Sequence, residues 1–261
     1  MQKQDTPSTV LIIAGNDPSG GAGICADIQA VTSLGCHPAP VITTLTVQDT
    51  GNALRVQTVD PDLVTAQITA VLNDMPVAAI KLGLLGSAAI GGAVASVLTD
   101  FPGVPIVLDP VFIAGGGARL AEGALIEVYL HNLIARAAII TPNAQEIRLL
   151  VPGAESAEEF VAGLLALGCK HVLLKGGDEN TPEVNNILFH EGGRSTRFSW
   201  ERLHGKFHGS GCTLASAIAA CLATGMSMQE AVYQAQLFTW HALQDSYSPG
   251  KGQAVPNRLP Q

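Results

Sequence analysis

The stretch VLIIAGNDPSGGAGICADIQAVTSL, residues 10–34, contains the unit from which the fold can be predicted. It begins with a short apolar run, residues 10–14, which is typical of a buried strand. It ends with residues 24–34, where apolar residues recur at helical spacing. The turn between them carries four glycines in nine residues. A strand that leads through such a turn into a helix is the repeating unit of α/β proteins.

The same alternation continues along the chain. Short apolar runs predict strands at residues 10–14, 41–45, 78–82, 106–108, 138–140 and 172–174. Helical spacing predicts helices at residues 24–34, 61–72, 88–98, 124–134, 144–150 and 157–167, with further helices after residue 205. Two more runs, 186–190 and 196–200, are joined by a glycine-containing turn and predict a hairpin. We therefore expect an α/β fold in three layers, with a mostly parallel central sheet between helices and a hairpin at one edge.

Length and composition favour one domain over residues 1–261. Apolar residues make up 47% of the 261 positions and charged residues only 14%, which is enough apolar material for one extended core. The first eight residues are polar and residues 247–261 are rich in glycine and proline, so we expect tails at 1–8 and 247–261.

Charge and cysteine usage exclude several classes of protein. A net charge of −8 without a basic stripe argues against a nucleic-acid partner. No apolar stretch approaches the roughly 18 residues that a membrane span requires, so we expect no membrane partner. The five cysteines are odd in number and lack a C-x-x-C pair, which indicates reduced thiols and a cytoplasmic protein.

The sequence GKFHGSGCTL, residues 205–214, predicts a glycine-rich loop that enters a helix. Backbone N–H groups of Gly209, Ser210, Gly211 and Cys212 would then converge at the positive end of the helix dipole, which favours an anion such as phosphate. A helix N-terminus also lowers a thiol pKa, so Cys212 is expected to be a thiolate beside that anion. The alternative is a tight turn in which Cys212 is a small core residue.

Polar residues near other predicted strand ends suggest further parts of a site, because ligands of open parallel sheets bind at the carboxyl ends of the strands. Asp27 lies one turn into the first helix and is either a partner of the helix dipole or a substrate ligand. Gln48, in a predicted loop at 46–51, offers a donor and an acceptor to a heterocycle, unless it is only a polar turn residue.

Two carboxylates and a lysine follow later strands. Asp109 and Glu146 each lie just past a strand, as a weakly held Mg²⁺ requires, although helix capping would explain each one singly. Lys175 ends a strand beside two glycines, where its ammonium can reach a phosphoryl oxygen; a solvated turn lysine is the alternative.

Seven ordered motifs make the chain resemble the hydroxymethylpyrimidine and phosphomethylpyrimidine kinases of thiamine biosynthesis, within the ribokinase-like superfamily. The resemblance covers residues 10–257. The motifs are IAGNDPSGGAGICAD at 13–27, VIT at 41–43 with Gln48, KLGLLG at 81–86, DPV at 109–111, TPNAQE at 141–146, KGG at 175–177 and HGSGCTL at 208–214. The resemblance implies a ribokinase-like α/β/α sandwich and an ATP- and Mg²⁺-dependent kinase.

The resemblance also implies roles for particular residues. Residues 209–212 would form the anion hole for the transferring γ-phosphoryl group, with Cys212 where related sugar kinases carry an aspartate base. The pyrimidine would be surrounded by Asp27, Gln48, Leu84, Val111 and the backbone of Gly15. The ATP phosphates and Mg²⁺ would be served by Lys175, Asn143, Asp109 and Glu146.

The chain departs from the family pattern at positions in the substrate and nucleotide loops. These are Asn16, Leu84, Phe112, the run Gly115-Gly116-Gly117 and Asp178. They make substrate identity less certain than reaction type.

The sequence thus predicts phosphorylation of 4-amino-5-hydroxymethyl-2-methylpyrimidine and of its monophosphate. One alternative is a pyridoxal or pyridoxine kinase of the same superfamily, and another is a non-catalytic pyrimidine-binding regulatory protein. The resemblance further implies a homodimer.

Overall fold

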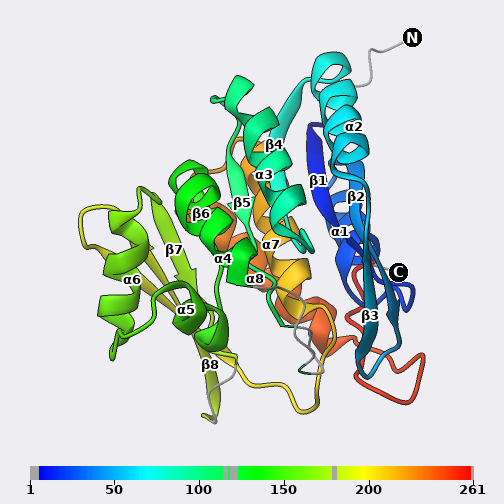
Figure 1. Cartoon of the computed structure of the whole chain (residues 1–261). Coiled ribbons are helices and arrows are strands. Elements are labelled where there is room, and N and C mark those ends of the chain that lie inside the picture. Colours follow the sequence, from blue (N-terminus) through cyan, green and yellow to red (C-terminus); the bar gives the residue numbers. More distant parts are fainter. Residues whose placement is uncertain (1–5, 114–116, 118–122, 178–180, 260–261) are drawn as a thin grey trace.

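The computed structural model describes residues 6–113, 117, 123–177 and 181–259 and contains one central sheet (Figure 1). Nine strands of the described chain lie side by side in the order β3-β2-β1-β4-β5-β6-β7-β8-β9. Their bounds are β1 Thr9–Asn16, β2 His37–Gln48, β3 Ala53–Thr58, β4 Val77–Leu82, β5 Ile106–Leu108, β6 Ile139–Ile140, β7 His171–Leu174, β8 Glu183–His190 and β9 Ser195–Glu201. This is the α/β fold with a mostly parallel sheet that the strand-helix alternation predicts.

The strands from β2 to β7 in this order run parallel, and antiparallel strands complete both edges. The predicted hairpin is present as β8 and β9, which pair antiparallel and extend the sheet beyond β7. The opposite edge was not expected to carry a hairpin, yet β3 pairs antiparallel with β2 there. Gln48 accordingly ends strand β2 and does not lie in a loop. The sequence of β3, ALRVQT, is mixed and largely exposed, so it lacks the apolar run of a buried strand.

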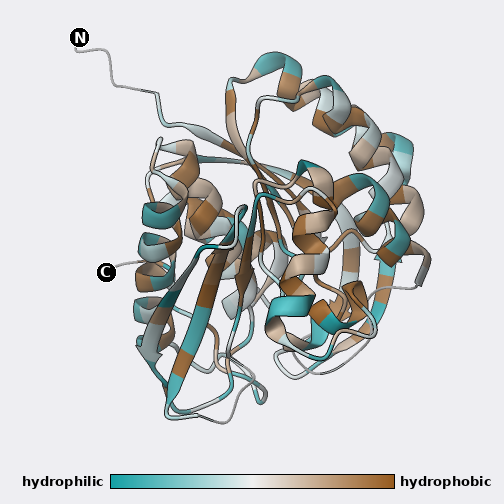
Figure 2. Cartoon of the chain, turned by 90° about the vertical axis from the view of Figure 1, so that its left-hand side faces the viewer, coloured by the Kyte–Doolittle hydropathy of each residue, from teal (hydrophilic) through white to brown (hydrophobic). Residues whose placement is uncertain are grey.

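Helices cover both faces of the sheet. One apolar core contains β1 residues Leu11 and Ile13 together with α2 to α6, and the other contains Val10 and Ile12 together with α1, α7 and α8. Successive side chains of a strand point to opposite faces, so β1 supplies both cores. Figure 2 shows the apolar strands in the middle of the molecule. The helices are α1 Gly23–Ser33, α2 Pro61–Asp74, α3 Ala88–Val97, α4 Gly123–Val128, α5 Ala144–Leu150, α6 Ala157–Ala166, α7 Ser210–Ala223 and α8 Met228–Gln244.

The predicted helix at 124–134 is interrupted. Regular α-helix ends at Val128, and Tyr129–Leu133 continue as a wider π-type turn. The Tyr129 ring packs edge-on against Phe112, with ring centroids 4.9 Å apart.

The segment after α8 is packed against the rest of the chain, although its glycines and prolines suggest a tail. Ala254 bridges to Phe207 and Val255 bridges to Tyr247. Val255 and Arg258 are buried.

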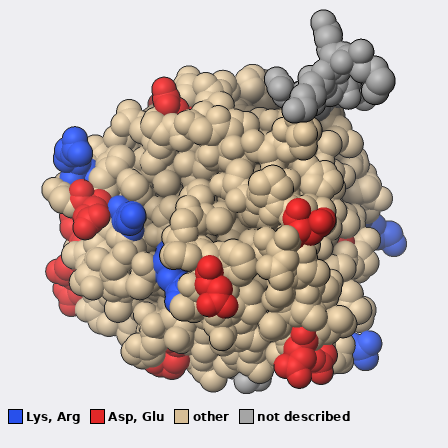
Figure 3. Space-filling view, turned by 90° about the horizontal axis from the view of Figure 1, so that it is seen from above, with Lys and Arg blue, Asp and Glu red and all other residues tan. Residues whose placement is uncertain are grey.

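The surface carries few charges in the view of Figure 3, where both signs are scattered without a single-sign patch on that face. Among the described residues, the helices are all too short or too polar to cross a membrane.

Candidate active site

A cavity of about 1190 Å³ lies at the carboxyl ends of the parallel strands. It gathers most of the residues that the sequence singles out, although they are spread over almost 200 positions. Those that line it are Gly15, Gln48, Leu84, Asp109, Val111, Asn143, Glu146, Lys175, Gly209, Ser210, Gly211 and Cys212. The topology of the sheet explains this, because loops that follow parallel strands meet at one edge.

Two helices begin at this cavity without a side-chain cap. Elsewhere in the described chain the helix caps are Asp60 for α2, Ser87 for α3, Asn143 for α5, Ser156 for α6 and Ser227 for α8. By contrast, α1 starts after Ala22 and α7 after Gly209, and neither N-cap residue has a side chain that caps its helix. At α1, however, Oδ2 of Asp17 accepts from the N–H of Ala22 at 2.8 Å. Gly209 has a positive φ of 83°, a conformation that glycine adopts readily. The start of α7 therefore leaves backbone N–H groups without a side-chain cap at the cavity, as an anion site requires. At the start of α1 the N–H groups of Ala22 and Gly23 already meet Asp17 and the Cys212 thiol.

Cys212 lies in the first turn of α7, but its thiol does not have the lowered pKa that the helix start suggests. Burial raises the pKa of Cys212 to about 11, although the nearby Lys81 ammonium and a backbone hydrogen bond from Gly23 lower it. The predicted thiolate is therefore wrong, because removal from water outweighs the helix dipole and the lysine. Cys212 is a neutral thiol at neutral pH.

Lys175 approaches the same point from β7. Its Nζ lies 3.2 Å from Oδ1 of Asp109 and 3.7 Å from Oε2 of Glu146. Burial alone would lower the pKa of Lys175, but the two carboxylates raise it above its ordinary value. The lysine thus remains protonated at the cavity wall, next to Gly211.

Asn143 and Glu146 cap a helix and also line the cavity, which combines the capping and ligand-binding roles considered from the sequence. The Asn143 side chain accepts from the N–H groups of Gln145 and Glu146, and Oε2 of Glu146 accepts from the N–H of Asn143. This is a capping box at the start of α5. Both side chains also line the cavity, so capping fixes them where a ligand would bind.

Asp27 corrects the sequence interpretation. It lies in α1 with no exposed surface, and its two oxygens are occupied, Oδ2 by Lys81 Nζ at 2.7 Å and Oδ1 by the Ser216 hydroxyl at 2.7 Å. Burial alone would lower the pKa of Lys81, but Asp27 raises it above its ordinary value. Burial also raises the pKa of Asp27, although the Lys81 ammonium and the Ser216 hydroxyl lower it. Asp27 is therefore placed to hold β4, α1 and α7 together and not to contact a substrate.

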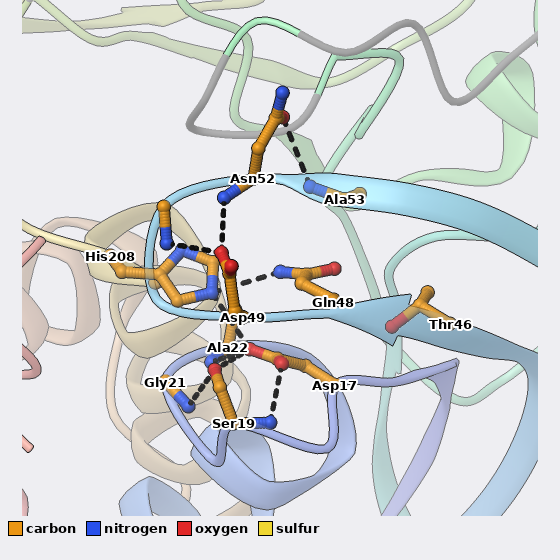
Figure 4. A network of polar contacts seen from close by, with 12 residues as sticks. Asp17, Ser19, Gly21, Ala22, Thr46, Gln48, Asp49, Asn52, Ala53 and His208 are labelled. Atoms are coloured by element: carbon orange, nitrogen blue, oxygen red, sulfur yellow. Dashed lines mark hydrogen bonds and ion pairs between the residues drawn. The ribbon is translucent and has the colours of Figure 1, made fainter. Parts of the chain in front are cut away.

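Sequence reasoning missed a polar network at the opposite wall, shown in Figure 4. Nε2 of His208 lies 2.7 Å from Oδ2 of Asp17 and 2.9 Å from Nε2 of Gln48. Burial raises the pKa of Asp17, but hydrogen bonds from His208, Ser19 and Ala22 outweigh it and leave the pKa below its ordinary value. Because an ionised carboxylate only accepts, Nε2 of His208 is the donor to Asp17. The same ring nitrogen then does not accept from the amide nitrogen of Gln48 beside it. The network links the loop after β1 to the residue that precedes Gly209.

A signal for this network was present in the sequence. Asp17 lies in the first glycine-rich loop and His208 in the second. Two loops that contribute to one ligand site lie close together, so a shared site predicts polar contacts between them.

Comparison with known proteins agrees with this geometry. The family model "Phosphomethylpyrimidine kinase" matches residues 17–257. The chain belongs to this family. It is 38% identical over 250 residues to the hydroxymethylpyrimidine/phosphomethylpyrimidine kinase of Salmonella typhimurium, covering 93% of this chain and 94% of that protein. The family match and the likeness to kinases of this name in several bacteria identify the chain as a kinase of thiamine biosynthesis.

Other similar proteins are longer or act on another vitamin. A thiamine biosynthesis bifunctional protein of Geobacter sulfurreducens is 38% identical over 256 residues, and this chain spans 96% of its own length but only 52% of that protein. The crystal structure of an ADP complex of Bacillus subtilis pyridoxal kinase superposes with a TM-score of 0.87 at 25% identity, covering 97% of this chain and 98% of that chain. The ribokinase-like fold is therefore shared with pyridoxal kinases.

The departures from the family pattern fall in different places. Asn16 and Leu84 line the cavity, whereas Phe112 is buried against Tyr129. Gly117 is described, but Gly115, Gly116 and Asp178 lie outside the described residues.

Proposed function

We propose that this kinase transfers the γ-phosphoryl group of ATP to the hydroxymethyl group of 4-amino-5-hydroxymethyl-2-methylpyrimidine, and then phosphorylates the monophosphate. The observation that carries this proposal is the convergence of the uncapped start of α7, the glycine-rich loop before α1 and Lys175 at one cavity. In the reaction, the hydroxyl oxygen bonds to the γ-phosphorus, the bond from that phosphorus to the ADP oxygen breaks, and the hydroxyl proton is released. Positioning and charge stabilisation account for most of the catalysis of such transfers.

The residues on the phosphate side fit a nucleotide. The N–H groups of residues 210–212 stabilise the negative charge of the transferring group, and Lys175 contacts a phosphoryl oxygen. That a related pyridoxal kinase binds ADP supports the assignment of ATP. Cys212, as a neutral thiol, does not act as a preformed base, and the loose transition state of phosphoryl transfer needs little removal of the hydroxyl proton beforehand.

The carboxylates beside Lys175 fit Mg²⁺. Asp109 and Glu146 both line the cavity, and Mg²⁺ binds through one or two carboxylates together with substrate phosphates and waters. When bound, this ion neutralises phosphate charge. We assign the two carboxylates to it and Asn143 to the nucleotide.

The pyrimidine is assigned to the opposite wall. Leu84 and Val111 provide apolar contacts, the Gly15 backbone borders the ring, and Gln48 pairs with the ring nitrogen and amino group. Unpaired buried polar groups discriminate strongly between ligands. We therefore expect the pyrimidine to be preferred over pyridoxal.

A pyridoxal kinase is the second candidate, because the likeness to the Bacillus subtilis enzyme extends over nearly the whole chain. A coupled assay of ADP release with the pyrimidine, its monophosphate and pyridoxal tests both. We expect kcat/KM for the pyrimidine to exceed that for pyridoxal by about 10²-fold or more, and Gln48→Leu to reduce this ratio. Equal efficiencies in the wild type would favour the pyridoxal kinase, and a ratio unchanged by Gln48→Leu would place specificity elsewhere.

We propose a homodimer for the assembled protein. The β2–β3 edge carries exposed apolar side chains, with Leu45, Val47 and Leu54 exposed by 49%, 46% and 73%. Clusters of this kind on an edge strand commonly mark an interface. Light scattering after size exclusion should give twice the chain mass for the wild type and less for Leu54→Lys. The five unpaired thiols support a cytoplasmic location.

A further inference from the structure

Arg258 is the largest fully buried side chain in the described part of the molecule, with only 1% of its surface exposed. It follows a segment that the sequence suggests is a tail. A buried arginine requires partners for its five N–H donors, because unpaired polar groups are costly inside a protein.

The guanidinium of Arg258 donates to three separate elements. Nη2 donates to the carbonyl of Gly21 at 2.5 Å, in the loop before α1. Nε donates to the Thr213 hydroxyl at 2.7 Å, in the first turns of α7, and Nη1 to Oε1 of Gln29 at 3.1 Å. The carbonyl of Arg258 itself accepts from the Ser33 hydroxyl, which fixes the segment to the end of α1.

These contacts reach the two glycine-rich loops directly. The Thr213 hydroxyl, which accepts from Arg258, donates to the carbonyl of Gly209 at 2.8 Å. A side chain at Gly209 would overlap the carbonyl of Gly21 and come within 2.9 Å of Nη2 of Arg258. The planar guanidinium thus sits where the two loops touch, and its fixed fork sets their spacing.

The charge of Arg258 lacks an ion-pair partner among the described residues, although Asp27 and Asp17 lie near enough to raise its pKa. Among the described residues, no carboxylate lies within 4 Å of its guanidinium. Burial lowers the pKa of Arg258, but an arginine remains protonated at neutral pH. A buried cation without a carboxylate is unfavourable on its own and is relieved by an anion bound nearby.

We propose that Arg258 is a positioning residue of the kinase, which fixes the spacing of the loops before α1 and α7 so that the start of α7 faces a nucleotide phosphate. Its buried charge also adds to the positive potential at that point. The inference rests on the proposed nucleotide site and extends it to a residue far along the chain. It predicts an effect on nucleotide binding and on kcat, and little effect on the pyrimidine.

Three variants separate this role from simple anchoring of the segment. Arg258→Gln removes the charge and the fork, Arg258→Lys keeps only the charge, and Ser33→Ala weakens the anchoring of the segment without touching either loop. Calorimetric titration with ADP and steady-state kinetics are measured for each. We expect Arg258→Gln to weaken ADP binding and to lower kcat by about tenfold each, with KM for the pyrimidine within twofold. Arg258→Lys should lie between it and the wild type, and Ser33→Ala should match the wild type.

ADP affinity and kcat of Arg258→Gln within twofold of the wild type, in a protein that unfolds cooperatively, would overturn the proposal. If that variant does not fold, Arg258→Lys with unchanged ADP affinity and kcat would overturn it equally. An equal loss in Ser33→Ala would also do so, because anchoring alone would then explain the effect. Failure of the wild type to phosphorylate the pyrimidine would overturn the proposed function instead, and ADP titration would still decide the role of Arg258.

Discussion

In the described part of the chain, Lys81 and Lys175 both face carboxylates and line the cavity, but they differ in exposure. Lys81 and Asp27 form a pair at 2.7 Å in which both side chains are fully buried. Lys175 keeps 14% of its side chain exposed and lies 3.2 Å from Asp109 and 3.7 Å from Glu146. The first pair is short, and a second hydrogen bond, from the Ser216 hydroxyl to Asp27, completes it. The second is longer and open on one side.

The difference separates a structural ion pair from a ligand site made of the same residue types. In the pair of Lys81 and Asp27, each charged group already has a partner of opposite charge, so neither group is available to a substrate. The longer contacts of Lys175 leave its ammonium able to turn toward a phosphate while the carboxylates turn toward a cation. Charge alone therefore does not identify a site; exposure and contact length do.

The largest effect is expected at the closed pair. Asp27→Asn leaves Lys81 as an uncompensated buried charge and should lower the free energy of unfolding by about 3–5 kcal/mol. Urea denaturation measures this loss, with Glu191→Gln at an exposed turn as the control. The double variant Asp27→Leu/Lys81→Met should lose less than Asp27→Asn. A loss below about 1 kcal/mol in the single variant would show that the pair is not structural.

The open lysine should affect catalysis more than stability. Lys175→Met removes the cation that contacts the phosphoryl group and should lower kcat by about 10²–10³-fold. Thermal unfolding should change less than in Asp27→Asn, because the contacts of Lys175 are longer and 14% of its side chain is exposed. Lys170→Met, at an exposed position before β7, serves as the control in the same ADP-release assay. A kcat within tenfold of the wild type would remove the distinction between the two lysines.

A variant of Glu146 tests whether Mg²⁺ binds beside Lys175, at the carboxylates of Asp109 and Glu146. Glu146→Gln keeps an oxygen for the capping box but loses the charge, so the Mg²⁺ concentration for half-maximal rate should rise about tenfold. Glu230 is a matched control, because it forms the same kind of capping box with Ser227 on α8. Equal Mg²⁺ titrations for Glu146→Gln, Glu230→Gln and the wild type would leave Glu146 as a cap only.

The smallest effect on catalysis is expected from the ionisation of Cys212, the thiol near both lysines. With a pKa of about 11, Cys212 is protonated throughout the range from pH 7 to 9. Its alkylation by iodoacetamide, followed by mass spectrometry, should speed up about tenfold per pH unit across that range, because only the thiolate reacts. Over the same range, the pH dependence of kcat should show no transition from the ionisation of this thiol. An alkylation rate that levels off below pH 8 would contradict the raised pKa.

The arrangement of the cavity was predictable from the sequence because it follows from the order of strands and loops. Gln48, Asp109 and Lys175 each end or follow a strand, and a parallel sheet brings such positions together. The structural role of Asp27 was not predictable, since its partner is 54 residues away on β4 and helical spacing does not reveal which face meets that lysine. The same holds for the thiol of Cys212, whose pKa depends on burial.

The sequence pattern did not predict the structure where the burial of a segment differs from what its amino-acid composition suggests. The edge strand β3 has no apolar run, since its outward positions face solvent. Residues before Arg258 contain glycine and proline in the proportions of a tail, yet the guanidinium is buried by contacts that only the folded chain provides. These features depend on tertiary neighbours, which one sequence does not show.

The contacts that close the cavity also have a consequence for the order of folding. Asp17 meets His208 across 191 residues, and Gly21 meets Arg258 across 237. Loops of this length must close before either contact forms, and contacts so distant in sequence are slow to form. The individual strand-helix units can assemble earlier, but none of them contains a complete nucleotide site. Nucleotide binding during refolding should therefore appear late, after most of the helical circular-dichroism signal has returned. It would report that the whole chain has folded.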